Sequence, residues 1–157
     1  MSERKPAADA RPEQAEALLR LVAAAERGNG SAACRLGDMY LEGLGGLRYS
    51  PRQAVRWYAR SAMAGDAHGQ NNVGACYEHG VGCKQSYASA ARYYRLAAGQ
   101  DLSTAAMNLG YCYLHGHGIA RHEELALRWF KTAVELGEER AAAEIERLQS
   151  QNGPRSS

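Results

Sequence analysis

Two short motifs in this sequence, Cys76-x-x-His79 and Cys112-x-x-His115, combine residue types that bind zinc. On a helix, a spacing of three residues sets the two side chains about 60° apart, with the Cys predicted inward and the His outward. The motifs are equivalent positions of a repeat, which packed helices hold roughly 10 Å apart. Zinc–ligand bonds are only about 2.0–2.3 Å long. We therefore expect no metal site and no cofactor.

The pattern Gly-x-Gly occurs three times and resembles the glycine-rich loops that bind phosphate. It is formed by Gly43 and Gly45, Gly80 and Gly82, and Gly116 and Gly118. Phosphates bind at helix N-termini, where N–H groups point outward. These glycines follow predicted helix C-termini, so we expect the first of each pair to end a helix in the left-handed conformation.

Enzymatic chemistry would need a nucleophile beside a base, or paired carboxylates, that converge in a pocket. The sequence contains no such motif. We therefore expect that the protein is not an enzyme.

These motifs belong to a unit that is present three times. Its first part is Leu36-Gly37-x-x-Tyr40, Val73-Gly74-x-x-Tyr77 and Leu109-Gly110-x-x-Tyr113, at spacings of 37 and 36 residues. An aromatic pair follows in each copy: Trp57-Tyr58, Tyr93-Tyr94 and Trp129-Phe130. A fixed period of this length predicts a solenoid, in which each unit buries its apolar face against its neighbours.

Each unit is predicted to form two helices of about 12 residues joined by short loops, which must pack antiparallel. In the first helix, apolar residues recur at helical spacing. The predicted N-caps of the first helices are Asn29, Asp66 and Ser103. The second helices are predicted to begin at Ser50-Pro51, Ser86 and His122.

The repeat boundaries predict one domain over residues 13–151. It consists of an N-terminal capping helix at 13–28, repeats at about 29–65, 66–101 and 102–137, and a C-terminal capping helix at 138–151. A terminal helix with a polar outer face is what a solenoid needs at its end. The polar segments 1–12 and 152–157 are predicted to be disordered tails.

The alanine pair, Leu-Gly-x-x-Tyr, Gly-x-Gly, Ala-x-x-Trp-Tyr and a closing alanine pair resemble the Sel-one-like repeat, a relative of the tetratricopeptide repeat. The resemblance covers about residues 13–148. It implies an all-α fold, an α/α solenoid of stacked antiparallel helix hairpins with a right-handed superhelix. It also implies a non-catalytic adaptor or scaffold, and the curvature of a solenoid offers a concave groove for a peptide or protein partner.

Composition argues against other classes of partner. A net charge of +2 is too small to indicate nucleic acid or a membrane surface. No apolar run approaches the roughly 20 residues of a membrane span, and the N-terminus lacks the apolar region of a signal peptide. We expect a cytoplasmic monomer.

The predicted binding surface is the floor of the concave groove, which the first helices line in the solenoids that this sequence resembles. On each first helix, four positions fall within about 60° of one another, nearly opposite the buried Leu, Gly and Tyr. The expected partner-binding residues are Arg35, Asp38, His68, Asn72, His79, Asn108, Tyr111 and His115. Asn can both donate to and accept from a peptide backbone, and Tyr is favoured at interfaces, which places Asn72, Asn108 and Tyr111 at the predicted centre.

Two alternatives remain open. A regulatory component could use Cys and His to respond to metal or redox state. We instead expect Cys34, Cys76 and Cys112 to be buried, reduced and structural. Cys83 should be the most reactive thiol, with a pKa lowered by Lys84. An anionic partner could instead bind a convex ladder of arginines, namely Arg56, Arg92 and Arg128.

Overall fold

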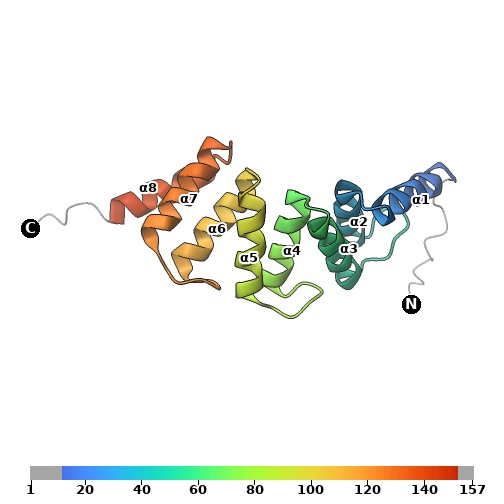
Figure 1. Cartoon of the computed structure of the whole chain (residues 1–157), viewed down its shortest axis with the longest axis horizontal. Coiled ribbons are helices and arrows are strands. Elements are labelled where there is room, and N and C mark those ends of the chain that lie inside the picture. Colours follow the sequence, from blue (N-terminus) through green and yellow to red (C-terminus); the bar gives the residue numbers. More distant parts are fainter. Residues whose placement is uncertain (1–11, 152–157) are drawn as a thin grey trace, which may run out of the picture.

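The computed structural model describes residues 12–151, and this part of the chain consists of eight α-helices without a strand (Figure 1). The helices are α1 (Pro12–Glu26), α2 (Gly30–Glu42), α3 (Pro51–Met63), α4 (Ala67–His79), α5 (Tyr87–Ala98), α6 (Ser103–His115), α7 (Glu123–Glu135) and α8 (Ala141–Gln151). The predicted all-α repeat fold is confirmed. The predicted tails fall outside the described residues, except that Pro12 begins α1. Within 12–151, no helix has the length and apolar character that crossing a membrane requires.

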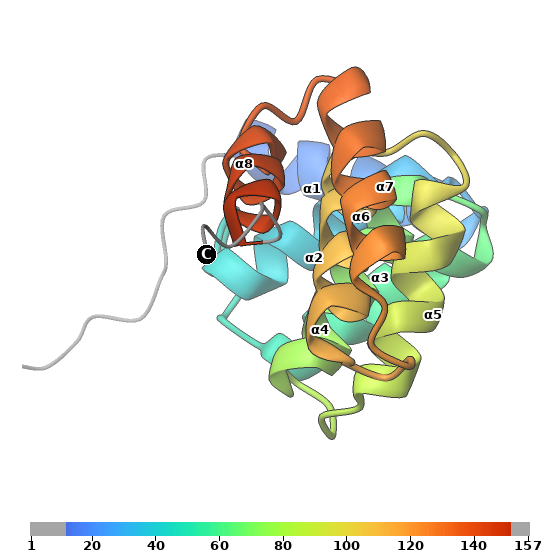
Figure 2. The ribbon, with the colours of Figure 1, turned by 90° about the vertical axis from the view of Figure 1, so that its left-hand side faces the viewer.

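The helices form a row of hairpins. The first helices α2, α4 and α6 pack most extensively against the second helices α3, α5 and α7 that follow them, and α1 and α8 each pack on one end of the row. These two helices lie at opposite ends of the molecule (Figure 1). An end-on view shows α8 and α2 toward one side of the molecule and α5 toward the other (Figure 2). Side-chain hydrogen bonds join α2 to α4, α4 to α6 and α6 to α8, so the first helices lie next to one another along one face of the molecule.

An aromatic ring on each second helix packs over the glycine of its first helix. A methyl group added to Gly74 would lie 2.8 Å from the ring of Tyr94, and one added to Gly110 would lie 2.7 Å from the ring of Phe130. Gly37 and Tyr58 have the same relation. The rings of Tyr94 and Phe130 are fully buried. This confirms that the two helices of a hairpin approach closely at the glycine.

The two glycines of each Gly-x-Gly have different roles. Gly43, Gly80 and Gly116 end α2, α4 and α6 in the left-handed conformation, as predicted, with φ of 70°, 67° and 72°. In the second and third copies the second glycine lies against the preceding repeat, because a side chain on Gly82 would meet the backbone of Pro51, whereas Gly45 lies against the Met39 side chain of its own repeat. Gly118 lies in the same way against the backbone of Tyr87. The first glycine thus caps a helix, and in the second and third copies the second glycine allows two repeats to stack.

The N-caps agree with the sequence at all but one of the predicted positions. The Asn29 carboxamide oxygen accepts from the N–H of Ala32, and the Asp66 carboxylate accepts from that of Gly69. The prediction for Ser103 is wrong: Ser103 is the first residue of α6, and Leu102 takes the N-cap position with no side-chain hydrogen bond. The reason is that Asp101 occupies the left-handed position that Gly65 fills one repeat earlier, with φ of 59°.

Replacing Gly110 by Leu should destabilise the fold, because the added atoms have no space beneath the Phe130 ring. The expected loss of unfolding free energy is roughly 1–3 kcal/mol or more, measured by chemical denaturation. Ala143→Leu on the exposed side of α8 is the control for added apolar volume and should cost little. If the two variants unfold alike, the close approach at Gly110 is incorrect.

Candidate partner-binding site

The structure places all eight predicted binding residues on the first helices α2, α4 and α6. Four of them are exposed and four are half-buried. The exposed ones are Arg35, His68, His79 and His115, and the half-buried ones are Asp38, Asn72, Asn108 and Tyr111. The half-buried side chains all make hydrogen bonds to other helices, which the sequence did not predict.

Asp38 joins two helices to its own. Its carboxylate oxygen accepts a hydrogen bond of 2.7 Å from the Tyr58 hydroxyl on α3. The same oxygen lies 3.4 Å from the Asn72 side-chain amide on α4, which donates to it. Burial of Tyr58, together with its bond to Asp38, raises the pKa of the tyrosine. Asp38 therefore holds its hairpin together and connects it to the next repeat.

The surface is hollowed on both sides of this junction. One hollow of about 290 Å³ is lined by Asp38, Leu41, Tyr58, Asn72, Ala75, Cys76, His79 and Val81. Another of about 240 Å³ is lined by Ser31, Cys34, Arg35, Asp38, Asp66, His68 and Asn72. Five of the eight predicted residues therefore line two adjoining hollows between α2 and α4.

Two further lining residues were assigned other roles from the sequence. Tyr58 was identified only as part of the repeated aromatic pair; its ring is buried, but its side chain also lines the hollow. Asp66 was assigned only as an N-cap, yet it lines the second hollow while it caps α4. A repeat pattern identifies the buried part of a side chain more readily than its polar end.

Asn108 and Tyr111 belong to a separate part of the face. The Asn108 side-chain amide donates to the carboxamide oxygen of Asn71 on α4 at 3.0 Å. The Tyr111 hydroxyl donates to Glu144 on α8 at 3.1 Å, and its ring packs edge-on against Phe130. These residues bridge α4 to α6 and α6 to α8, so the predicted centre is divided between two junctions.

A cluster around Glu78 was missed by the sequence analysis. The Tyr94 hydroxyl donates to its carboxylate at 2.6 Å, and ring nitrogens of His79 and His117 lie 3.8 and 3.9 Å from it. The equivalent residues in the other repeats are Leu41 and Leu114, so the repeat carries no signal for a charge here. Across residues 12–151, no three His, Cys, Asp or Glu side chains are arranged to hold a metal ion.

The thiols are those of a packed interior. All four cysteines are unpaired, and Cys34, Cys76 and Cys112 are buried. Burial raises the pKa of Cys34 and Cys112 to about 12 and that of Cys76 to about 11. Burial also raises the pKa of Cys83, so the predicted lowering by Lys84 is wrong. Since the thiolate is the reactive form, these shifts disfavour a redox role.

The hairpins, their glycine contacts and their shared face define an α/α solenoid built from helix-hairpin repeats. The chain belongs to the Sel1 repeat family, whose model matches residues 30–66, 67–102 and 103–138. Proteins of this family generally mediate protein–protein interactions and are generally non-catalytic scaffolds. No curated protein matches the chain.

Solved structures agree with this assignment. A Sel1 repeat protein from Oxalobacter formigenes is 33% identical, with a TM-score of 0.81 over 87% of this chain. A protective antigen of uropathogenic Escherichia coli with the SLR fold is 30% identical, with a TM-score of 0.84 over 88% of this chain. The chain spans 56% and 30% of the length of these two relatives. Helicobacter pylori cysteine-rich protein B shares the fold, with 23% identity and a TM-score of 0.66. This match covers 88% of the present chain and 98% of the Helicobacter protein.

Brief alkylation of the native protein should modify Cys83 first, because it is the one thiol of the four that is not fully buried. Cys34, Cys76 and Cys112 should react much more slowly, since burial and their raised pKa values keep them as protonated thiols at neutral pH. Mass spectrometry of peptides from the labelled protein measures the four rates. Equal labelling of all four would contradict the packing described here.

The thiols should also make the fold less stable in alkali. A raised pKa means that the folded state holds its proton more tightly than the unfolded state. Their contribution is complete below the unfolded thiol pKa of about 8.5 and is lost as the pH rises toward about 12, the folded value of Cys112. Urea unfolding across this range should show a shallower pH dependence for Cys112→Ala than for the natural chain. Equal slopes would contradict the assigned shift.

Proposed function

We propose that this chain is a non-catalytic adaptor, a cytoplasmic monomer that holds an extended segment of a protein partner on the face of its first helices. The pair of hollows that adjoin at Asp38 and Asn72 carries the proposal. They lie side by side on the face that the first helices share, so one segment can run across both and continue along this face to Asn108 and Tyr111 on α6.

The side chains at the hollows suit a peptide backbone. Asp38 accepts hydrogen bonds, and Asn72 can donate and accept. His68 and His79 are exposed at the edges of the two hollows, and Arg35 adds a positive charge to one of them. Tyr58 supplies an aromatic wall whose hydroxyl is already bonded to Asp38. An extended segment with one acidic side chain matches this set of groups.

The test compares two variants with the same number of substitutions. The first carries Asn72→Ala, Asn108→Ala and Tyr111→Ala on the first helices. The second carries Arg56→Ala, Arg92→Ala and Arg128→Ala on the second helices, all at exposed positions. Affinity capture followed by mass spectrometry should identify a protein that the natural chain and the arginine variant retain. The first-helix variant should lose it.

Direct titration of that protein then measures affinity. Each removed side chain makes a hydrogen bond between helices, so each substitution should also cost about 0.5–1.5 kcal/mol of stability. Binding is therefore measured well below the melting temperature of the least stable variant. If the first-helix variant binds normally and the arginine variant does not, the partner binds the second-helix face.

A further inference from the structure

Helix α1 has the sequence of a second helix, but no described helix occupies the place of its first helix. Its residues Ala17, Leu21 and Ala24 align with Ala54, Tyr58 and Ser61 on α3. In all three hairpins the residues at these positions are at most 3% exposed, namely Ala54, Tyr58, Ser61, Ala90, Tyr94, Ala97, Ala126, Phe130 and Ala133. On α1, Ala17 is exposed, and Leu21 and Ala24 are half-buried. A face that is buried throughout the repeats is thus open at this end.

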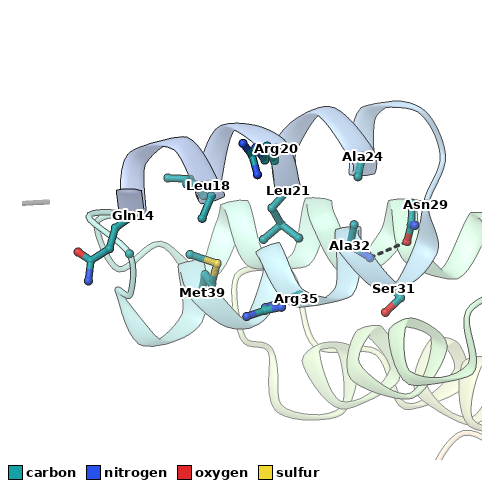
Figure 3. Close-up of a pocket in the computed structure, with 12 residues that line it drawn as sticks. Gln14, Leu18, Arg20, Leu21, Ala24, Asn29, Ser31, Ala32, Arg35 and Met39 are labelled. Carbon is teal, nitrogen blue, oxygen red and sulfur yellow. Dashed lines mark hydrogen bonds between the residues drawn. The ribbon is translucent and has the colours of Figure 1, made fainter. Parts of the chain in front are cut away.

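The open face forms one wall of a hollow of about 630 Å³ between α1 and α2 (Figure 3). Leu18 and Leu21 on α1 point toward α2, where Met39 points back toward them (Figure 3). The equivalent residues in the interior repeats are Cys76 and Cys112, and both of these cysteines are buried. In the interior, the corresponding place against α3 and α4 is filled by the helix α2. The hollow, which we name the terminal seat, therefore has the form of a site for a helix.

The charge of the terminal seat is positive. Arg20 and Arg35 line it, together with ten uncharged residues and no acid. Arg20 pairs with Glu16, but Arg35 takes part in none of the ion pairs among residues 12–151. The residue equivalent to Arg35 in the next repeat is Asn72, which donates to Asp38 of the helix that fills its seat. An acidic residue at the same point of an incoming helix would pair with Arg35.

We propose that the terminal seat binds an amphipathic α-helix of a protein partner, with a small residue over Leu21 and an acid facing Arg35. The lining residues of α1 extend from Gln14 to Ala24, about 15 Å at about 1.5 Å per residue, or close to three helical turns. Helices with one apolar stripe commonly bind in grooves of this kind. The seat adjoins the face of the proposed function and shares Ser31 and Arg35 with one of its hollows, but its other lining residues belong to neither hollow.

A second copy of the chain is a poorer occupant. The helix it could offer is α8, which aligns with the first helices and has no second helix of its own among the described residues. However, α8 carries Glu146 where the first helices have glycine, and Arg147 where α2 has Asp38. In the seat, Arg147 would face Arg35, and two positive charges would oppose each other.

The probe is a fluorescent peptide of residues 30–45 with Cys34→Ser. It has the sequence of α2, which fills the equivalent interior seat. It supplies Gly37 as the small residue over Leu21 and Asp38 as the acid that faces Arg35. Titrated with the full chain, it should bind by fluorescence anisotropy. Ala17→Trp fills the seat from an exposed position and should weaken binding about tenfold or more.

Charge reversal makes the test specific. Arg35→Glu should weaken binding of the probe, and a probe that carries Asp38→Lys should recover affinity for that variant. Arg56→Glu makes the same charge change on an exposed position of α3 and should leave binding unchanged. Circular dichroism checks that the variants melt like the natural chain. Absence of binding, or binding that Ala17→Trp and Arg35→Glu leave unchanged, overturns the proposal.

Sedimentation tests the other occupant. If the natural chain forms larger species as its concentration rises and Ala17→Trp abolishes them, the seat binds a second copy, and the choice of a partner helix is wrong. A chain that stays monomeric while the probe binds supports the proposal.

Discussion

The close contact between an aromatic ring and a glycine sets the geometry of this solenoid. Gly37, Gly74 and Gly110 each leave the space that a ring of the second helix fills, so the helices of a hairpin approach closely. Side chains in such interiors are packed about as densely as in crystals, and even one added carbon must displace a neighbour. Because the same contact recurs in each hairpin, the two helices approach each other closely at the same place in all three hairpins.

Stacking then brings particular polar positions together. The residue before the Leu of a first helix meets the residue two after the Leu of the preceding one, as Asn72 meets Asp38 and Glu144 meets Tyr111. Between α4 and α6 the second position is Ala75, which has no polar group, and Asn108 bonds to Asn71 instead. The second glycine of Gly-x-Gly supports the same stacking where Gly82 lies against Pro51.

These regularities explain what the sequence could predict. The helices, the left-handed caps and the buried aromatics follow from residues that every repeat shares, so one chain shows them three times. Ser103 was misassigned because its repeat replaces the glycine before the N-cap with Asp101, which adopts the left-handed conformation that glycine usually supplies. The Glu78 cluster and the bonds of Asn108 and Tyr111 involve positions that differ between repeats. A period cannot predict such pairs, because each depends on which two side chains meet.

The positions that vary are therefore the ones that can distinguish one binding surface from another. The second position after the Leu is Asp38, Ala75 or Tyr111 in successive repeats, while the glycine beside it does not change. The ring contact constrains the glycine, whereas the residue next to it must only be compatible with the neighbouring first helix. An acid, a methyl group and a phenol at equivalent places give three junctions of different chemistry on one regular frame. A partner that lies along the first helices meets these junctions in a fixed order, and this order gives the surface a direction and a composition that a perfectly repeated one would lack.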